Sequence, residues 1–244
     1  MEKHPLALLG ADAPVNISQA LTSLGFVPLL LDASKHLPKP TRSHADMLIF
    51  CAGNCIFSSK DHINKSPCTF EKLKEYGYSI VESDTALGDR YPYDIPFNMA
   101  LIGNYIFGNI KFASKEIIDY ASKNSIELIS VKQGYTKCST VVINHNAIIT
   151  ADSGIESAAR GLGIDTLNIE NSPSSVSLAG YDYGFLGGAC GVYQDKIYFV
   201  GNISRHPNGI QIIDFCHKHG LEVISLSDTA LTDIGGIIFL DPLN

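Results

Sequence analysis

A glycine-rich loop at residues 171–191 carries side chains suited to binding a cation. It reads NSPSSVSLAGYDYGFLGGACG and places Asp182 between Tyr181 and Tyr183. Tyrosine faces attract cations, and a carboxylate pairs with an ammonium or guanidinium group. The loop therefore predicts a site for a planar cationic group. The alternative is a turn whose tyrosine rings pack on the protein and whose Asp182 caps backbone amides; the residues alone leave both open.

Two further carboxylates stand where strands end or helices begin. Asp152 precedes Ser153 as a candidate helix N-cap, and Asp233 precedes a glycine pair and an apolar run. Carboxylates gathered around one water-excluding pocket repel one another, which raises their proton affinity unless a cation binds. If these residues meet Asp182, the expected ligand is a small cationic metabolite, an amine or a guanidinium, rather than a phosphate.

One of the six cysteines is a candidate nucleophile. Cys138 starts a β-branched run, and His145 lies in the same predicted hairpin, but the turn places His145 at its far end. Cys51 and Cys55 lack the second cysteine pair of a zinc site. The single glycine of residues 10–14 has no downstream lysine, unlike a phosphate-binding loop. We therefore expect no metal and no cofactor.

The chain around Cys138 shows what scaffold positions these side chains. Residues 138–171 read as a β-hairpin, a short helix that begins after Asp152, and a third strand. The same order recurs in residues 98–131, in residues 187–227 and, more loosely, in residues 46–83. A recurrence of this length predicts a repeat architecture.

A fifth copy appears only when the two ends of the chain are joined. Residues 234–240 supply its first strand, and residues 5–9, 16–24 and 27–31 supply a strand, a helix and a strand. Pairing of the terminal strands would close a ring and leave no sheet edge open. We predict an α/β propeller of five units that uses residues 1–244 as one domain. The alternative is an ordinary α/β domain, in which strands and helices alternate by construction.

Composition narrows the classes of partner. The net charge of −7 disfavours nucleic acid, because a phosphate backbone requires a basic surface. No apolar run approaches the roughly 20 residues of a membrane span, and the N-terminal apolar run is too short for a signal peptide. We expect a cytoplasmic protein without a membrane or nucleic-acid partner; the sequence leaves its oligomeric state open.

The five-copy order and three sequence runs point to a known group. GYDYGFLGGACG, VVINHNAIITADSGI and LTDIGGIIFL resemble an uncharacterised bacterial family of the pentein fold. That fold is the α/β propeller of guanidino-group-modifying enzymes, and also of a non-enzymatic ribosome-binding initiation factor. The resemblance covers essentially the whole chain, and it implies the propeller and an axial site.

The residues that the resemblance implies for catalysis are mostly absent. The enzymes carry a glycine pair or triplet, two further residues and then a nucleophilic cysteine, whereas Phe239 stands at that position here. Gln133 stands where they have a general-base histidine, and Asn98 falls near a guanidinium-binding acid. Only Asp46 keeps a carboxylate. Without thiolate and imidazole, attack on a guanidinium carbon lacks a nucleophile and a proton relay.

Three functions remain open. The first is binding of a small cationic metabolite, or divergent chemistry on it, in an axial pocket; a divergent hydrolase would use Cys138. Six residues are expected to line this pocket: Asp46, Asp152, Tyr181, Asp182, Tyr183 and Asp233. The second is a non-catalytic protein that acts through a protein-binding surface. The third is a nucleotide-using α/β enzyme built on residues 10–14.

Overall fold

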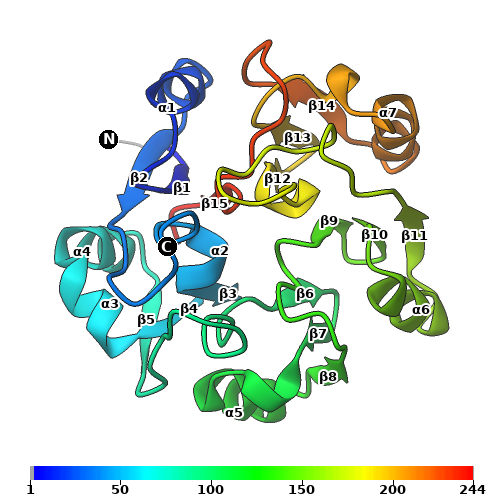
Figure 1. Cartoon of the computed structure of the whole chain (residues 1–244). Coiled ribbons are helices and arrows are strands. Elements are labelled where there is room, and N and C mark those ends of the chain that lie inside the picture. Colours follow the sequence, from blue (N-terminus) through cyan, green and yellow to red (C-terminus); the bar gives the residue numbers. More distant parts are fainter. Residues whose placement is uncertain (1–2, 244) are drawn as a thin grey trace.

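The computed structural model describes residues 3–243 as five three-stranded sheets arranged around a central axis (Figure 1). In each unit the first two strands pair antiparallel, and the third strand pairs parallel to the second after a helical crossover. The first strands lie nearest the axis and the crossover helices lie outside. The predicted five-unit α/β propeller is confirmed.

Three units follow the predicted pattern closely. The unit at residues 138–171 consists of β9 (Thr140–Asn144), β10 (Ala147–Thr150), α6 (Ser153–Gly161) and β11 (Asp165–Asn168). The preceding unit consists of β6 (Ala100–Ile102), β7 (Tyr105–Gly108), α5 (Lys115–Lys123) and β8 (Glu127–Ser130). The following unit consists of β12 (Cys190–Tyr193), β13 (Lys196–Phe199), α7 (Gly209–Lys218) and β14 (Glu222–Ser225).

The α6 unit shows why these residues form these elements. Asp152 is the N-cap of α6, and its carboxylate accepts hydrogen bonds from the amides of Gly154 and Ile155. Ile155 and Ala159, four residues apart on one helix face, are buried. All four residues of the central strand β10 are buried, which explains its continuous apolar run.

The second unit contains two helices that the sequence pattern does not predict. Its strands are β3 (Ile49–Ala52), β4 (Cys55–Ser59) and β5 (Ser79–Ser83), with α4 (Pro67–Glu75) as the crossover helix. The one-turn helix α2 (Ala45–Leu48) precedes β3, and α3 (Lys60–Lys65) follows β4. Ser59 caps α3 by accepting a hydrogen bond from the His62 amide. Both helices are too short to show a 3.6-residue apolar period.

The fifth unit is built from both ends of the chain, as predicted. It consists of β15 (Ile238–Leu240), β1 (Leu6–Gly10), α1 (Val15–Ser23) and β2 (Val27–Leu31). β1 pairs antiparallel with β15, with Leu6 opposite Leu240. The expectation that no sheet edge is left open is wrong, because the five sheets are separate and each keeps its own edges. β15 begins later than predicted, since Gly235 and Gly236 have φ values of +79° and +75°.

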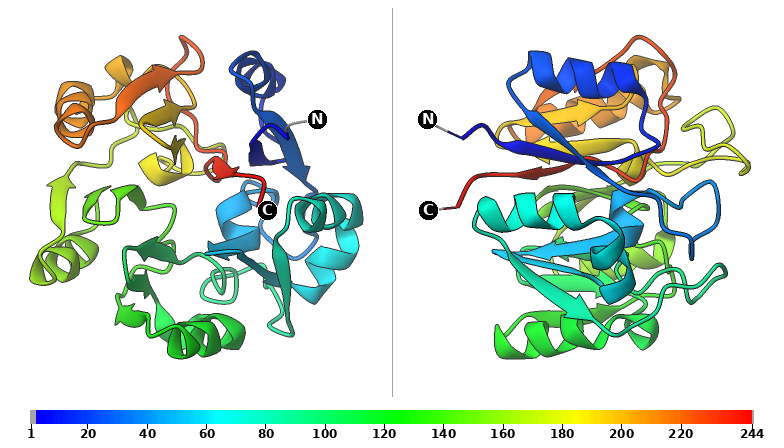
Figure 2. Two further views of the ribbon diagram at one scale, coloured as in Figure 1. Left: turned by 180° about the vertical axis from the view of Figure 1, so that it is seen from behind. Right: turned by 90° about the vertical axis from the view of Figure 1, so that its left-hand side faces the viewer.

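The two faces of the ring differ. Residues 32–44, 84–97 and 171–185 extend as loops on one face, which we call the loop face (Figure 2). Both chain ends lie towards the opposite face, which also carries the hairpin turns and which we call the turn face. Short 3-10 helices occur at Ile110–Phe112 (η1), Leu186–Gly188 (η2) and Ile203–Arg205 (η3). Within residues 3–243, no helix has the length and apolar character that crossing a membrane requires.

Candidate functional site

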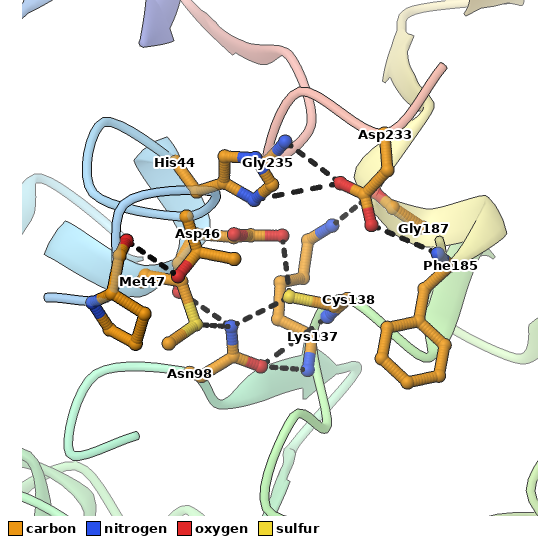
Figure 3. A network of polar contacts seen from close by, with 12 residues as sticks. His44, Asp46, Met47, Asn98, Lys137, Cys138, Phe185, Gly187, Asp233 and Gly235 are labelled. Atoms are coloured by element: carbon orange, nitrogen blue, oxygen red, sulfur yellow. Dashed lines mark hydrogen bonds and ion pairs between the residues drawn. The ribbon is translucent and has the colours of Figure 1, made fainter. Parts of the chain in front are cut away.

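Polar groups, most of them buried, meet at the ring axis, just before the first strand of each unit (Figure 3). We call this set the polar layer; it comprises Asp46, Asn98, Lys137, Cys138, Gly188, Asp233 and Gly235. Asp46 lies on α2, Asn98 precedes β6, and Cys138 precedes β9. Because each unit repeats the same backbone path, the five units bring these residues to one place although they are far apart in sequence.

Asn98 ties three units together. Its side-chain oxygen accepts hydrogen bonds from the backbone amides of Lys137 (2.8 Å) and Cys138 (3.3 Å). Its amide nitrogen donates to the backbone oxygen of Asp46 at 2.9 Å. The Asn98 side chain is fully buried, so these backbone groups have no access to water as an alternative partner. Asn98, which the resemblance places near a guanidinium-binding acid, thus has a structural role here.

Cys138 is a buried thiol next to a carboxylate. Its Sγ donates a hydrogen bond to Oδ2 of Asp46 at 3.0 Å, and the Asn98 amide nitrogen lies 3.0 Å from the same sulfur. Burial raises the pKa of Cys138 well above its ordinary value, and the charges of Asp46 and Asp233 raise it further. His145 is exposed in the turn between β9 and β10, so it forms no relay with this thiol.

Asp233 is a second buried carboxylate of the layer. It accepts hydrogen bonds from the amides of Phe185 (2.9 Å) and Gly235 (3.0 Å), and His44 Nδ1 lies 3.6 Å from its Oδ1. A Cβ atom on Gly188 would lie 2.0 Å from Asp233 Oδ1, so this glycine makes room for the carboxylate. Burial raises the pKa of Asp233; the His44 charge opposes this rise and the Asp46 charge adds to it.

A cavity of about 260 Å³ lies between the polar layer and the loops, and we call it the loop-side pocket. Its lining includes the carboxylates of Asp182 and Asp233 and four aromatic residues: Tyr135, Tyr181, Tyr183 and Phe185. The ring centroids of Tyr135 and Phe185 are 6.3 Å apart, and those of Tyr183 and Phe185 are 6.1 Å apart. The pocket therefore combines negative charge with a continuous aromatic wall.

The loop at residues 84–97 contacts Tyr135, one of the aromatic residues that line the loop-side pocket. Asp94 is buried, and its Oδ2 accepts a hydrogen bond of 2.7 Å from the Tyr135 hydroxyl. The ring of Tyr91 lies 5.8 Å from that of Tyr135. Burial raises the pKa of Tyr135, and the hydrogen bond to Asp94 raises it further. This loop thus fixes one wall of the loop-side pocket.

The structure brings together most of the predicted lining residues. Tyr181, Asp182, Tyr183 and Asp233 line the loop-side pocket, with Cys138 at its inner end. Asp46 lies behind Cys138 and lines a different cavity.

Asp152 is expected to line the same pocket as Asp182 and Asp233, but it does not. Its carboxylate is occupied at the start of α6, where it also accepts a hydrogen bond of 3.2 Å from Gln133 Nε2. Its role as a helix cap, which the sequence also predicts, explains its placement.

Four residues of the polar layer and the loop-side pocket are not predicted from the sequence: His44, Tyr135, Lys137 and Phe185. Tyr135 and Lys137 lie in a short polar segment, and His44 ends a Pro-containing connector, so no periodicity distinguishes them. Phe185 follows the tyrosine pair, and the aromatic spacing is the only signal that marks it.

Phe239 and Gln133, which stand at the catalytic positions that the resemblance implies, make structural contacts. Phe239 lies in an aromatic cluster, with ring centroids 4.7 Å from Phe26 and 5.1 Å from Tyr198. Gln133 accepts a hydrogen bond from the Tyr135 amide in addition to its contact with Asp152. Neither side chain lines the loop-side pocket.

Solved structures with the same fold are enzymes of guanidino compounds. Dimethylarginine dimethylaminohydrolase from Pseudomonas aeruginosa, a cysteine-to-serine mutant in complex with citrulline, matches with a TM-score of 0.57 and 11% identity over 93% of each chain. C. jejuni agmatine deiminase, a cysteine-to-serine mutant with substrate bound, matches with a TM-score of 0.58 and 10% identity over 100% of this chain and 95% of that one. The arginine dihydrolase ArgZ from cyanobacteria matches with a TM-score of 0.57 and 11% identity over 99% of this chain and 40% of its own.

These identities establish the fold and nothing finer. All three structures are pentein-fold enzymes, so the resemblance that the repeat predicts is confirmed at the level of the fold. No curated protein matches the sequence. A family model, described as a family of unknown function (DUF6873), matches residues 8–238. The chain therefore belongs to the DUF6873 family, and its fold is the pentein fold.

Proposed function

We propose that this protein binds a small cationic metabolite, an amine or a guanidinium, in the loop-side pocket. The observation that carries the proposal is the convergence of Asp182, Asp233 and four aromatic rings on one cavity. Carboxylates pair with cations, and aromatic faces attract them when water is displaced. A phosphate or carboxylate ligand would meet like charge from both acids.

The electrostatics of Asp233 support the proposal. Its raised pKa means that its negative charge is under-compensated where it is buried. The two amide donors and His44 offset only part of this cost. A bound cation would supply the missing compensation, so binding and ionisation of Asp233 should favour each other.

The mouth of the pocket offers rings that are free to contact a ligand. Tyr181 is 49% exposed and Tyr183 is 38% exposed, although both lie on a loop over the cavity. Asp182 between them is also exposed. A ligand entering here would pass the outer carboxylate first and reach Asp233 at the inner end.

A second candidate function is covalent chemistry at Cys138, because this thiol lines the same pocket as His44 and Asp233. The raised pKa of Cys138 disfavours it, since the thiolate is the nucleophile. The test is turnover of guanidino compounds. Product formation above background by the purified protein, abolished in Cys138→Ser, would establish this function. If no product forms, cation binding remains the proposed function.

Calorimetric titration with agmatine, arginine, methylguanidine and putrescine tests the binding proposal. Asp233→Asn should weaken a bound cation by about 2–5 kcal/mol, because the lost pair is buried. Asp182→Asn should weaken it by about 1 kcal/mol, because that carboxylate is exposed. The control is Asp89→Asn, which removes an exposed acid that does not line the pocket. If no cation binds, or if all three variants bind equally well, the proposal is wrong.

A further inference from the structure

The ring has a second opening on the far side of the polar layer. Two adjoining cavities of about 240 and 200 Å³ share Lys137, Val142 and Ile238, and we call them together the bore. All five first strands contribute to its walls. Apolar and thiol side chains of these strands line it, among them Phe50, Cys51, Leu101, Val142, Val192 and Phe239.

The bore is reached from the turn face. The first strands run from the polar layer to their hairpin turns, so their later residues lie farther from the loop-side pocket. Cys51, Leu101 and Val142 lie near the ring axis yet are only half-buried. This residual exposure means that solvent reaches the bore.

One carboxylate and one ammonium group stand at its inner end. Asp46 is 1% exposed; its Oδ2 accepts the hydrogen bond from Cys138, and its Oδ1 has no partner within the described residues. Lys137 Nζ makes one long contact, 3.4 Å to the Gly187 oxygen, and no carboxylate of residues 3–243 lies within 4.0 Å of it. A buried carboxylate oxygen without a partner, and a half-buried ammonium with one long contact, lack hydrogen-bond energy that a ligand can restore.

The Asp46 carboxylate and the Lys137 ammonium group limit the kinds of ligand that the bore can bind. A ligand with only a carboxylate would pair with Lys137 but be repelled by Asp46. A ligand with only an ammonium group would pair with Asp46 but be repelled by Lys137. A purely apolar molecule would leave both groups unpaired. A head group that carries both charges satisfies both residues and adds no net charge, and an apolar side chain then matches the walls.

We propose that the bore binds an apolar α-amino acid. Its carboxylate pairs with Lys137, its ammonium donates to Asp46, and its side chain lies along the first strands. The site is separate from the loop-side pocket, since Asp46, Lys137 and Val142 are absent from the lining of that pocket. The proposal does not depend on the proposed cation site.

Calorimetric titration with L-leucine tests the proposal, with two probes that each lack one charge. L-leucinamide has no carboxylate and isocaproate has no ammonium, so each should bind roughly 30-fold or more weakly than L-leucine. Lys137→Met and Asp46→Asn should each cause a similar loss for L-leucine. If L-leucine does not bind, or if the three probes bind equally, the proposal is overturned.

Two further variants keep the test decisive if the polar-layer variants fold poorly. Val142 is half-buried, so Val142→Phe should fill the bore and abolish L-leucine binding with little change in melting temperature. Asp182→Asn, in the loop-side pocket, should leave L-leucine affinity unchanged. L-leucine binding that persists in Val142→Phe, or is lost in Asp182→Asn, would place the amino acid outside the bore and overturn the proposal.

Discussion

The polar layer has two arcs that fill the ring centre in different ways. On one arc, three units place side chains there, Asp46, Asn98 and Cys138. The Asn98 side chain bonds to backbone groups of Asp46 and Cys138, and the Cys138 thiol donates to the Asp46 carboxylate. On the other arc, two units place glycines, and backbone groups bond directly: the Gly236 amide donates to the Gly188 oxygen at 2.7 Å. The side chain of Asp233 enters this second arc, in the space left by Gly188.

The difference teaches how a repeated fold acquires an asymmetric site. The repeat fixes where each unit's backbone reaches the axis, but it does not fix what fills the axis. The side-chain arc joins units through buried hydrogen bonds, and its loss should affect stability first. The glycine arc admits a carboxylate that also lines the loop-side pocket, and its alteration should affect ligand chemistry as well.

Removing residues 234–244 should have the largest effect, because it deletes half of the glycine arc together with β15. β1 would lose its antiparallel partner and apolar surface would be exposed. We expect a chain without a cooperative thermal transition, as measured by circular dichroism. A truncated protein that melts within about two degrees of the parent would show that ring closure contributes little.

Asn98→Leu breaks the side-chain arc at its centre. The change keeps the approximate volume but leaves the amides of Lys137 and Cys138 and the oxygen of Asp46 without a partner. At roughly 1–3 kcal/mol for each of these three groups, the free energy of unfolding should fall by about 3–9 kcal/mol in urea denaturation. The control is Asn124→Leu on the exposed end of α5, which should cost less than about 1 kcal/mol. Equal losses in both variants would contradict the role given to Asn98.

Gly188→Ala breaks the glycine arc by steric conflict. The new Cβ would lie 2.0 Å from Oδ1 and 2.5 Å from Cγ of Asp233, so we expect a loss of about 1–3 kcal/mol in unfolding free energy. The double variant with Asp233→Gly should recover part of this loss, because the carboxylate causes the clash. Gly161→Ala, where no atom lies within 4 Å of the new Cβ, is the control. Additive losses in the double variant would indicate a different cause.

The smallest expected effect is the pH dependence that Asp233 contributes. Its pKa in the folded state is raised above the ordinary 3.8, so the folded state holds this proton more tightly than the unfolded state. Stability should therefore fall as pH rises from about 3.8 through the raised pKa, by at most about 1.4 kcal/mol per pH unit. The measurement is the difference in unfolding free energy between the parent and Asp233→Asn, from pH 3.5 to 8.

That difference isolates Asp233 from an opposite contribution. Burial lowers the pKa of His62 to about 4, which makes stability rise with pH between about 4 and 6.5 in parent and variant alike. If the parent and the variant show the same slope, Asp233 is not a strained carboxylate in the folded protein.

The sequence predicts the repeat well because its signals are local. β-branched runs, a turn at Asn144–Asn146 and a cap at Asp152 each act within a few residues. The pairing of the chain ends is also predicted, since the fifth copy is complete only when they are joined. The helices α2 and α3 are missed because four and six residues are too few for a period.

The site is harder to predict because its contacts cross the ring. Asp182 and its neighbours are found from composition, but nothing near Cys138 indicates that its partners are Asp46 and Asn98. Asp152 is assigned to the pocket on its charge, whereas its hydrogen bonds place it at a helix start. The partners of Cys138 and the position of Asp152 depend on how separate units pack together. A local sequence pattern does not reveal such contacts.

The pairing of β1 with β15 has a consequence for synthesis on the ribosome. A nascent chain emerges from its N-terminus, so Leu6–Gly10 is available long before its partner Ile238–Leu240 exists. The middle units contain their own hairpins and are able to fold as they emerge, because their contacts are close in sequence. One apolar edge of β1 therefore stays unpaired until β15 has left the exit tunnel. We expect this interval to be when the nascent protein depends most on a chaperone.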